Sequence, residues 1–227
     1  MKSIKLFNEK VEVGVSDLRD GNMRFFEGDD EKEIINNQSE LGRKIGLEFD
    51  YIARINTIYK DRKNFTDYFE VDEKNIEEFC IKNSEFKIPA SDGLVTKSKN
   101  IGILLPLADC LGVVVFDKRQ NIFGVLHAGR HNVEQDGPRK FIDFLKEKFK
   151  SDSKDLFLYF SPCAQNYCVF ALNNRKLLDI AKEQFVNAGV LEENVISSGI
   201  DTVSNDDFPS NSSGDKKMRF AIVARQK

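Results

Sequence analysis

The 227-residue chain has only two histidines, His127 and His131, so acid–base or metal chemistry near neutral pH has few places to occur. Long apolar runs are also missing. The longest, residues 101–107, is far too short for a membrane-spanning helix, and the N-terminal residues lack the apolar region of a signal peptide. Its 34 basic residues are balanced by 37 acidic ones and form no basic stripe, which argues against nucleic-acid binding. We therefore expect a cytoplasmic protein without a membrane or nucleic-acid partner.

Cysteine is scarce as well, with four residues in a chain rich in apolar core residues. A protein of this size does not need a disulfide framework, and the spacing does not suggest one. Cys163 and Cys168 lie five positions apart, but no second Cys or His pair accompanies them as a zinc knuckle would require. We expect these two residues and Cys80 to be small buried hydrophobic residues.

Hydrophobic patterns predict alternating helices and strands. We expect helices over residues 29–47, 138–150 and 174–188, with a short helix inside 72–82. Strands are expected within residues 11–28 and over 51–59, 94–96, 101–107, 112–116, 122–127, 156–160 and 218–225. No repeat or linker divides the chain, so we predict one α/β domain over residues 1–227, with a mixed central sheet.

Two of the predicted strands carry candidate chemistry. The apolar run that starts at residue 101 ends on Cys110, and the run that starts at residue 122 ends on His127. If two neighbouring strands end in this way, a thiolate and an imidazole reach the same sheet edge. Such a pair suits either a zinc ion or a cysteine nucleophile with a histidine base. The alternative is a buried cysteine beside a histidine that serves packing.

The order of several short motifs resembles the laccase-domain family. These motifs are Ser91-Asp-Gly-Leu-Val-Thr96, Leu107-Ala-Asp-Cys110, Leu126-His-Ala-Gly129 and Phe160-Ser-Pro162. The family is associated with zinc-dependent purine nucleoside phosphorylases. The resemblance implies an α/β (α+β) layered sandwich similar to the catalytic domain of cytotoxic necrotizing factor. It also implies a purine nucleoside and phosphate as substrates, and phosphorolysis of adenosine or inosine, with deamination left open.

The resemblance also implies site residues. The family holds its metal with two histidines and a cysteine, and Cys110 and His127 match two of these three positions. Tyr59 stands at the third position, where a phenol with a pKa near 10 makes a poor zinc ligand. His131, four residues after His127, is a weak substitute. Cys110, His127 and Asp109 are the expected catalytic residues.

Asp109 is open to two interpretations, as a carboxylate that orients a histidine N–H or as the cap of the following turn. Arg130 is the expected phosphate-binding residue, chosen over Arg54, Arg62 and Arg139. Asn132 and Gln165 are candidates for reading a base edge.

This sequence departs from the family pattern after His127, where Arg130 follows directly on Gly129 and the tryptophan is lost, and in residues 208–214, which lack a basic pair. Three hypotheses follow. The first is a divergent purine nucleoside phosphorylase that uses a metal ion, expected to be zinc, held by Cys110 and His127. The second is a pseudoenzyme or nucleoside-binding relative that lost its metal site through Tyr59. The third is a metal-free Cys–His hydrolase or deamidase, by analogy with the toxin domain.

Overall fold

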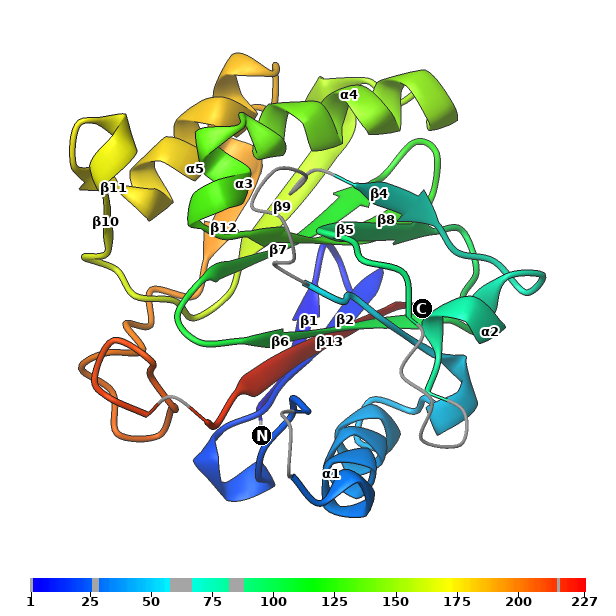
Figure 1. Ribbon diagram of the computed structural model, residues 1–227. Helices are drawn as coiled ribbons and strands as arrows, with labels where there is room; N and C mark the ends of the chain where they lie inside the picture. Colours follow the sequence, from blue (N-terminus) through cyan, green and yellow to red (C-terminus); the bar gives the residue numbers. More distant parts are fainter. Residues whose placement is uncertain (1, 26–28, 58–66, 82–87, 216) are drawn as a thin grey trace.

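Two mixed β-sheets lie face to face, and helices cover both outer faces (Figure 1). The computed structural model describes residues 2–25, 29–57, 67–81, 88–215 and 217–227. The expectation of mixed α/β architecture is confirmed, whereas the expectation of one central sheet is wrong. Many strands are apolar on both faces, and each sheet buries one face against the other sheet and one against helices.

The five-stranded sheet has the order β1-β2-β13-β6-β3, with all neighbours antiparallel except β6 and β3. Its strands are β1 (Lys2–Leu6), β2 (Val11–Val15), β13 (Phe220–Gln226), β6 (Gly102–Leu107) and β3 (Ile52–Arg54). Strand β13, from the far end of the sequence, therefore lies at the centre of the sheet, between β2 and β6.

The six-stranded sheet has the order β12-β9-β7-β8-β5-β4, and only its two outer pairs are parallel. Its strands are β12 (Val195–Ser197), β9 (Leu156–Phe160), β7 (Leu111–Asp117), β8 (Ile122–Ala128), β5 (Gly93–Thr96) and β4 (Tyr68–Glu70). A small separate hairpin joins β10 (Cys168–Val169) to β11 (Arg175–Lys176).

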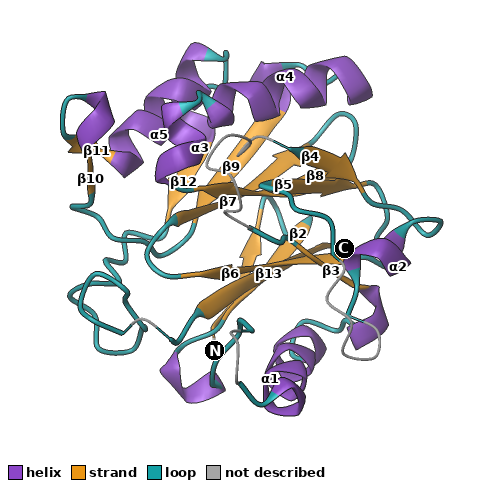
Figure 2. Ribbon diagram, viewed as in Figure 1, coloured by secondary structure: helices purple, strands orange, loops and turns teal. Residues whose placement is uncertain are grey.

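The helices divide between the outer faces, as Figure 2 shows. Helix α1 (Glu31–Arg43) covers the five-stranded sheet and begins at Asp30, whose side chain accepts hydrogen bonds from two backbone N–H groups. The six-stranded sheet is covered by α3 (Arg130–Glu134), α4 (Gly137–Phe149) and α5 (Leu177–Asn187), while α2 (Ile76–Phe79) lies to one side (Figure 1). Short 3-10 helices occupy residues 18–20, 49–51, 153–155, 170–172 and 192–194.

Alternating side chains create three apolar layers. On β6, Ile103 and Leu105 point into the layer between the sheets, whereas Leu104 packs toward α1. On β7, Val114 points between the sheets and Val113 packs toward α4 and α5. Burial of both faces explains why these strands appear in the sequence as continuous apolar runs.

The predicted helices and most predicted strands are confirmed, but their ends differ: α1, α5 and β3 are shorter than predicted, whereas β5, β7 and β8 are longer. Residues 174–176 are not helical because Arg175 and Lys176 pair with the β10 strand, and α5 starts only at Leu177. The sequence does not predict strands β1, β4, β10, β11 and β12. In the part of the chain that the structure describes, no helix is both long and apolar enough to cross a membrane.

Candidate functional site

Cys110 and His127 meet where β7 begins and β8 ends. The chain leaves β6 at Leu107, crosses to the other sheet, and enters β7 at Leu111. Antiparallel pairing of β7 with β8 sets Gly112 opposite His127, so Cys110 lies just beyond that pair. The argument from two neighbouring strand ends is wrong, because β6 and β8 belong to different sheets. The start of β7, not the end of β6, carries the cysteine to the histidine.

His127 is held by a buried carboxylate, that of Asp92. Its Nδ1 lies 3.1 Å from Asp92 Oδ1, and its backbone N–H donates to the Asp92 carbonyl oxygen at 2.7 Å. An ionised carboxylate only accepts hydrogen bonds, so Nδ1 carries the proton and Nε2 is left for another partner. Asn132 Nδ2 approaches the second Asp92 oxygen at 3.4 Å. The imidazole is thus fixed in both orientation and tautomer.

The thiol of Cys110 shares a hydrogen bond with His127 and also accepts one from the backbone N–H of Arg130. Burial alone would raise the pKa of the Cys110 thiol, but the hydrogen bond and the charge of His127 outweigh burial and lower that pKa below the ordinary thiol value. By contrast, burial raises the pKa of Cys163 to about 12. Cys110 therefore has the surroundings of a reactive cysteine, and Cys163 does not.

Gly129 has no side chain, and this leaves room for the side chains of His127 and Cys110 to meet. A Cβ at this position would lie 2.6 Å from His127 Cε1, 2.9 Å from Nε2 and 3.2 Å from Cys110 Sγ. Its backbone is extended, with φ −85° and ψ 174°, so glycine is needed here for space and not for conformation.

Asp109 anchors the loop over the site. Its carboxylate accepts hydrogen bonds from Thr202 Oγ1 at 3.0 Å and from the Ser212 backbone N–H at 2.7 Å. Its carbonyl oxygen accepts the Ala164 N–H at 3.0 Å. Asp92, and not Asp109, is the carboxylate that orients the histidine. The hydrogen bonds of Asp109 instead hold Thr202 and Ser212 near Cys110.

Arg130 and His131 open helix α3 on the exposed side of the site. Arg130 Nη2 lies 3.0 Å from His131 Nε2, and His131 Nδ1 lies 3.4 Å from Glu134 Oε2. The imidazole of His131 is thus engaged by its own helix neighbours. His127 is on strand β8, so the two histidines do not share a helix face.

A cleft of about 110 Å³ opens next to the thiol. Besides Cys110 and Arg130, its walls include an aromatic ring, apolar side chains and polar loop residues, among them Tyr167, Leu177, Asn211 and Ser212. A cleft that combines a cation, a ring and a thiol can accept a small molecule with a planar part and an anionic part.

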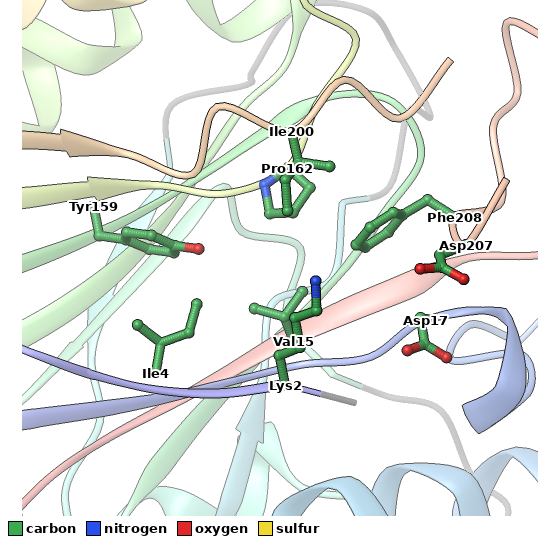
Figure 3. A pocket seen from close by; sticks show the side chains of 9 residues that line it. All are labelled: Lys2, Ile4, Val15, Asp17, Tyr159, Pro162, Ile200, Asp207 and Phe208. Atoms are coloured by element: carbon green, nitrogen blue, oxygen red, sulfur yellow. The ribbon is translucent and has the colours of Figure 1, made fainter. Parts of the chain in front are cut away.

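A second and smaller cavity, of about 20 Å³, lies between the sheets near β1 (Figure 3). The hydroxyl of Tyr159 points toward it, opposite Ile4 and beside Pro162, and Asp17 and Asp207 lie at its far end (Figure 3). Burial raises the pKa of Tyr159 to about 12. No thiol or imidazole lines this cavity, and its size suits a water molecule better than a substrate.

The described residues do not complete a metal site. Cys110 and His127 supply two donors, but within the described ranges no group of three or more His, Cys, Asp or Glu side chains could hold a metal ion, His131 included. Tyr59, the expected third position, lies outside those ranges, as does Arg62. Zinc normally takes three protein ligands in a catalytic site, so the described donor set does not fit it.

The remaining expected contacts take other roles. Arg54 is 3% exposed and donates to Gln38 Oε1 and to the Ile52 carbonyl, so it is a core residue. Arg139 pairs with Asp136 on the surface of α4. Gln165 Nε2 donates to the Ile200 carbonyl at 3.3 Å.

Sequence reasoning missed Asp92. Asp92 lies within the motif Ser91-Asp-Gly-Leu-Val-Thr96, but its place beside His127 follows from the pairing of Gly93 with Leu126, the residue before His127.

Fold and site together define a layered α/β protein with a Cys–His–Asp cluster beside a small-molecule cleft. A family model described as multi-copper polyphenol oxidoreductase laccase matches residues 6–176. The chain belongs to this laccase-like family.

Relatives of known name share only part of their length with this chain. A purine nucleoside phosphorylase, YlmD of Bacillus subtilis, is 32% identical over 82 residues, which cover 36% of this chain and 29% of the relative. A purine nucleoside phosphorylase of Borreliella burgdorferi is 31% identical over 90 residues, covering 40% and 39%. The chain therefore spans well under half the length of these two curated relatives.

Solved structures share the whole fold. YfiH of Bacillus licheniformis superposes with a TM-score of 0.81 at 16% identity, over 96% of this chain and 93% of the other. YlmD of Geobacillus stearothermophilus also gives 0.81, at 15% identity, over 96% and 92%. At these identities the likeness concerns the fold.

Proposed function

We propose that this protein is a divergent purine nucleoside phosphorylase that cleaves adenosine or inosine with phosphate in the cleft beside Cys110. The observation that carries the proposal is the line of contacts from Asp92 through His127 to Cys110, at the wall of a cleft that also contains Arg130. The names of the partial relatives support the substrate class.

The reaction breaks the bond between sugar C1′ and purine N9 and forms a bond from a phosphate oxygen to C1′. Positive charge develops on the sugar as the base leaves, and the purine takes up a proton at N7. The proton of the Cys110 thiol would pass to His127 Nε2, and the resulting thiolate would stabilise that positive charge while Nε2 donates the proton to purine N7. The proton lost from the phosphate that attacks C1′ would restore the thiol. Asp92 would keep the ring in position, Arg130 would contact phosphate from the rim, and Asp109 would hold the loop over the substrate.

No step of this scheme depends on zinc, because the described residues offer only two of the ligands it would need. Our scheme therefore rests on proton transfer and charge stabilisation by side chains of the chain itself.

The test is phosphate-dependent release of hypoxanthine from inosine by the purified full chain. Cys110→Ala and His127→Ala should each lower turnover by about 10²-fold or more, and the double variant should be no worse than either single one. Cys168→Ala and His131→Ala are matched controls that should retain activity. Full activity in Cys110→Ala, or none in the wild-type protein with any purine nucleoside, would overturn the proposal.

A second candidate is a metal-free Cys–His hydrolase or deamidase, proposed by analogy with the toxin domain that the resemblance suggests. The lowered pKa of Cys110 and the carboxylate behind His127 favour it, because both are features of activated cysteine nucleophiles. Such an enzyme would release product without phosphate and form an acyl bond to Cys110 that mass spectrometry can detect. Release of ammonia from adenosine would show that the protein also deaminates this nucleoside, a question that the family resemblance leaves open. The pseudoenzyme hypothesis requires nucleoside binding without turnover.

We further propose that the chain acts as one domain in the cytoplasm, without nucleic-acid or membrane partners. The central place of β13 in a sheet with β1 and β2 supports the single domain, because both ends of the described sequence complete the same sheet.

A further inference from the structure

Two arginines that lie far apart in the sequence reach the end of β6, next to the thiol. The antiparallel register of β13 with β6 pairs Phe220 with Leu107, so Arg219 is adjacent to the turn that carries Asp109 and Cys110. On the other side of β6, Arg24 Nη2 donates to the carbonyl oxygen of Thr57 at 3.2 Å. Thr57 follows β3, which pairs in parallel with β6. Arg219 Nη1 donates to the carbonyl oxygen of Met218 at 2.7 Å. The two arginines therefore lie on the two flanks of the same sheet end.

Asn22 fixes the spacing of the two arginines. Its Oδ1 accepts the backbone N–H groups of Arg24 and Arg219, both at 3.1 Å, and its Nδ2 donates to the Arg24 carbonyl at 2.8 Å. The Met23 N–H donates to the Arg219 carbonyl at 3.0 Å. Asn37 Nδ2, from α1, holds the Asn22 carbonyl at 3.1 Å. These hydrogen bonds thus fix the loop after β2 to the start of β13, and with them the backbones of Arg24 and Arg219.

The positive charge of Arg24 acts on Arg219, so the two arginines lie within electrostatic reach of each other. Burial, and next the positive charge of Arg24, lower the pKa of Arg219, while the charges of Asp109, Asp215 and Cys110 act in the opposite direction. The charge of Cys110 also acts on Arg219, so this arginine lies within electrostatic reach of the reactive thiol.

We infer that Arg24 and Arg219 form a binding site for a tetrahedral oxyanion such as phosphate, beside Cys110. A guanidinium donates two parallel hydrogen bonds to phosphate oxygens, and two guanidiniums on opposite flanks can grip one anion from two sides. Arg130 is exposed on the rim and screened by water, so its contribution is smaller than that of the half-buried pair. The identity of the anion as the phosphorolysis substrate rests on the proposed function, whereas the binding of the anion does not.

The test measures binding of inorganic phosphate to the full chain by titration calorimetry and by the phosphate-induced rise in melting temperature. Arg24→Met and Arg219→Met should each weaken phosphate binding by about tenfold or more, and Arg219→Lys should weaken it less. Arg130→Met should weaken it by a smaller factor.

Arg225→Met is the matched control, since Arg225 lies at the other end of the same strand and donates to the Gly46 carbonyl at 2.7 Å. This variant should bind phosphate like the wild-type protein. Circular dichroism without phosphate verifies that each variant is folded. If Arg219→Met does not fold, Arg219→Lys replaces it in the binding measurement.

Unchanged phosphate affinity in both Arg24→Met and Arg219→Met would overturn the inference, as would failure of the wild-type protein to bind phosphate. Phosphate binding that depends on the pair, in a protein that releases no base from any purine nucleoside, would support the inference and overturn the proposed function instead.

Discussion

Asp92→Asn separates the role of the carboxylate from that of the histidine it holds. In the wild-type protein, Asp92 accepts from His127 Nδ1 through one oxygen and is approached by Asn132 Nδ2 at the other. Asparagine has a donor in place of one of these acceptors. Whichever way the new amide turns, a donor meets either His127 Nδ1 or Asn132 Nδ2. If it faces the ring, the proton is forced onto Nε2, the atom that should receive the proton of Cys110.

The expected change in reactivity follows from the loss of the charged hydrogen bond between Asp92 and His127. Such a bond contributes about 1.5–3 kcal/mol, which corresponds to about 10- to 150-fold in the population of the imidazolium–thiolate pair. The pKa of Cys110 is lowered in the wild-type protein by His127, so its thiolate persists as the pH falls below the ordinary thiol value. In Asp92→Asn we expect the thiolate to be lost at higher pH, and alkylation at neutral pH to slow by the same factor.

The assay is the rate of iodoacetamide alkylation as a function of pH, followed by mass spectrometry of intact protein. Cys168 is partly exposed, so the measurement uses a Cys168→Ser background, with Cys110→Ala as the blank. Asp92→Glu tests whether the charge alone suffices. An identical pH profile in the wild-type protein and Asp92→Asn, with both proteins folded, would refute the reasoning.

Three further outcomes are expected. Gly129→Ala should abolish the low-pH alkylation of Cys110 and lower turnover by about 10²-fold, because the added methyl group would overlap His127; a wild-type alkylation profile would contradict this. Tyr159→Phe should leave the free energy of unfolding in urea unchanged or raise it by about 1 kcal/mol, since the buried hydroxyl has no hydrogen-bond partner among the described residues; a loss of stability would show that a bound water satisfies it. Tyr59→His should increase zinc content by elemental analysis, because a third nitrogen ligand would complete the set, and a wild-type protein that already carries one zinc per chain would contradict the two-donor description.

Strong local patterns made much of the fold predictable. The apolar stripe of residues 138–150 and the run at 156–160 each carry enough period to define α4 and β9. Strands of three residues such as β4 and β12 carry no such period, since their pairing is fixed by β5 and β9 from elsewhere in the chain. The division into two sheets could not be predicted from the sequence either, because strands that are buried on both faces have the same composition in either sheet.

The sequence predicted individual residues of the site but not the contacts between them. Cys110 and His127 stood out by scarcity and by motif, but the reason for their meeting lies in the β7–β8 register, which follows a crossing between sheets. Asp92 lies within the motif Ser91-Asp-Gly-Leu-Val-Thr96, but only the pairing of β5 with β8 brings it to His127, whereas Asp109 directly precedes the cysteine in sequence. Arg24 and Arg219 carry no local signal, because only tertiary pairing brings them to one end of β6.

The central position of β13 has a consequence for how the protein is made. Ser16 Oγ accepts the Ala221 N–H across a separation of 205 positions, and β13 lies between strands that are synthesised long before it. During translation, the edges of β2 and β6 that later pair with β13 remain unpaired. Unpaired strand edges can form hydrogen bonds with other chains and so promote aggregation. Contacts of this sequence separation also slow folding. Ribosome-bound chains that stop before residue 220 should therefore depend on chaperones, and Arg219 would reach Cys110 only when the last of these strands is inserted.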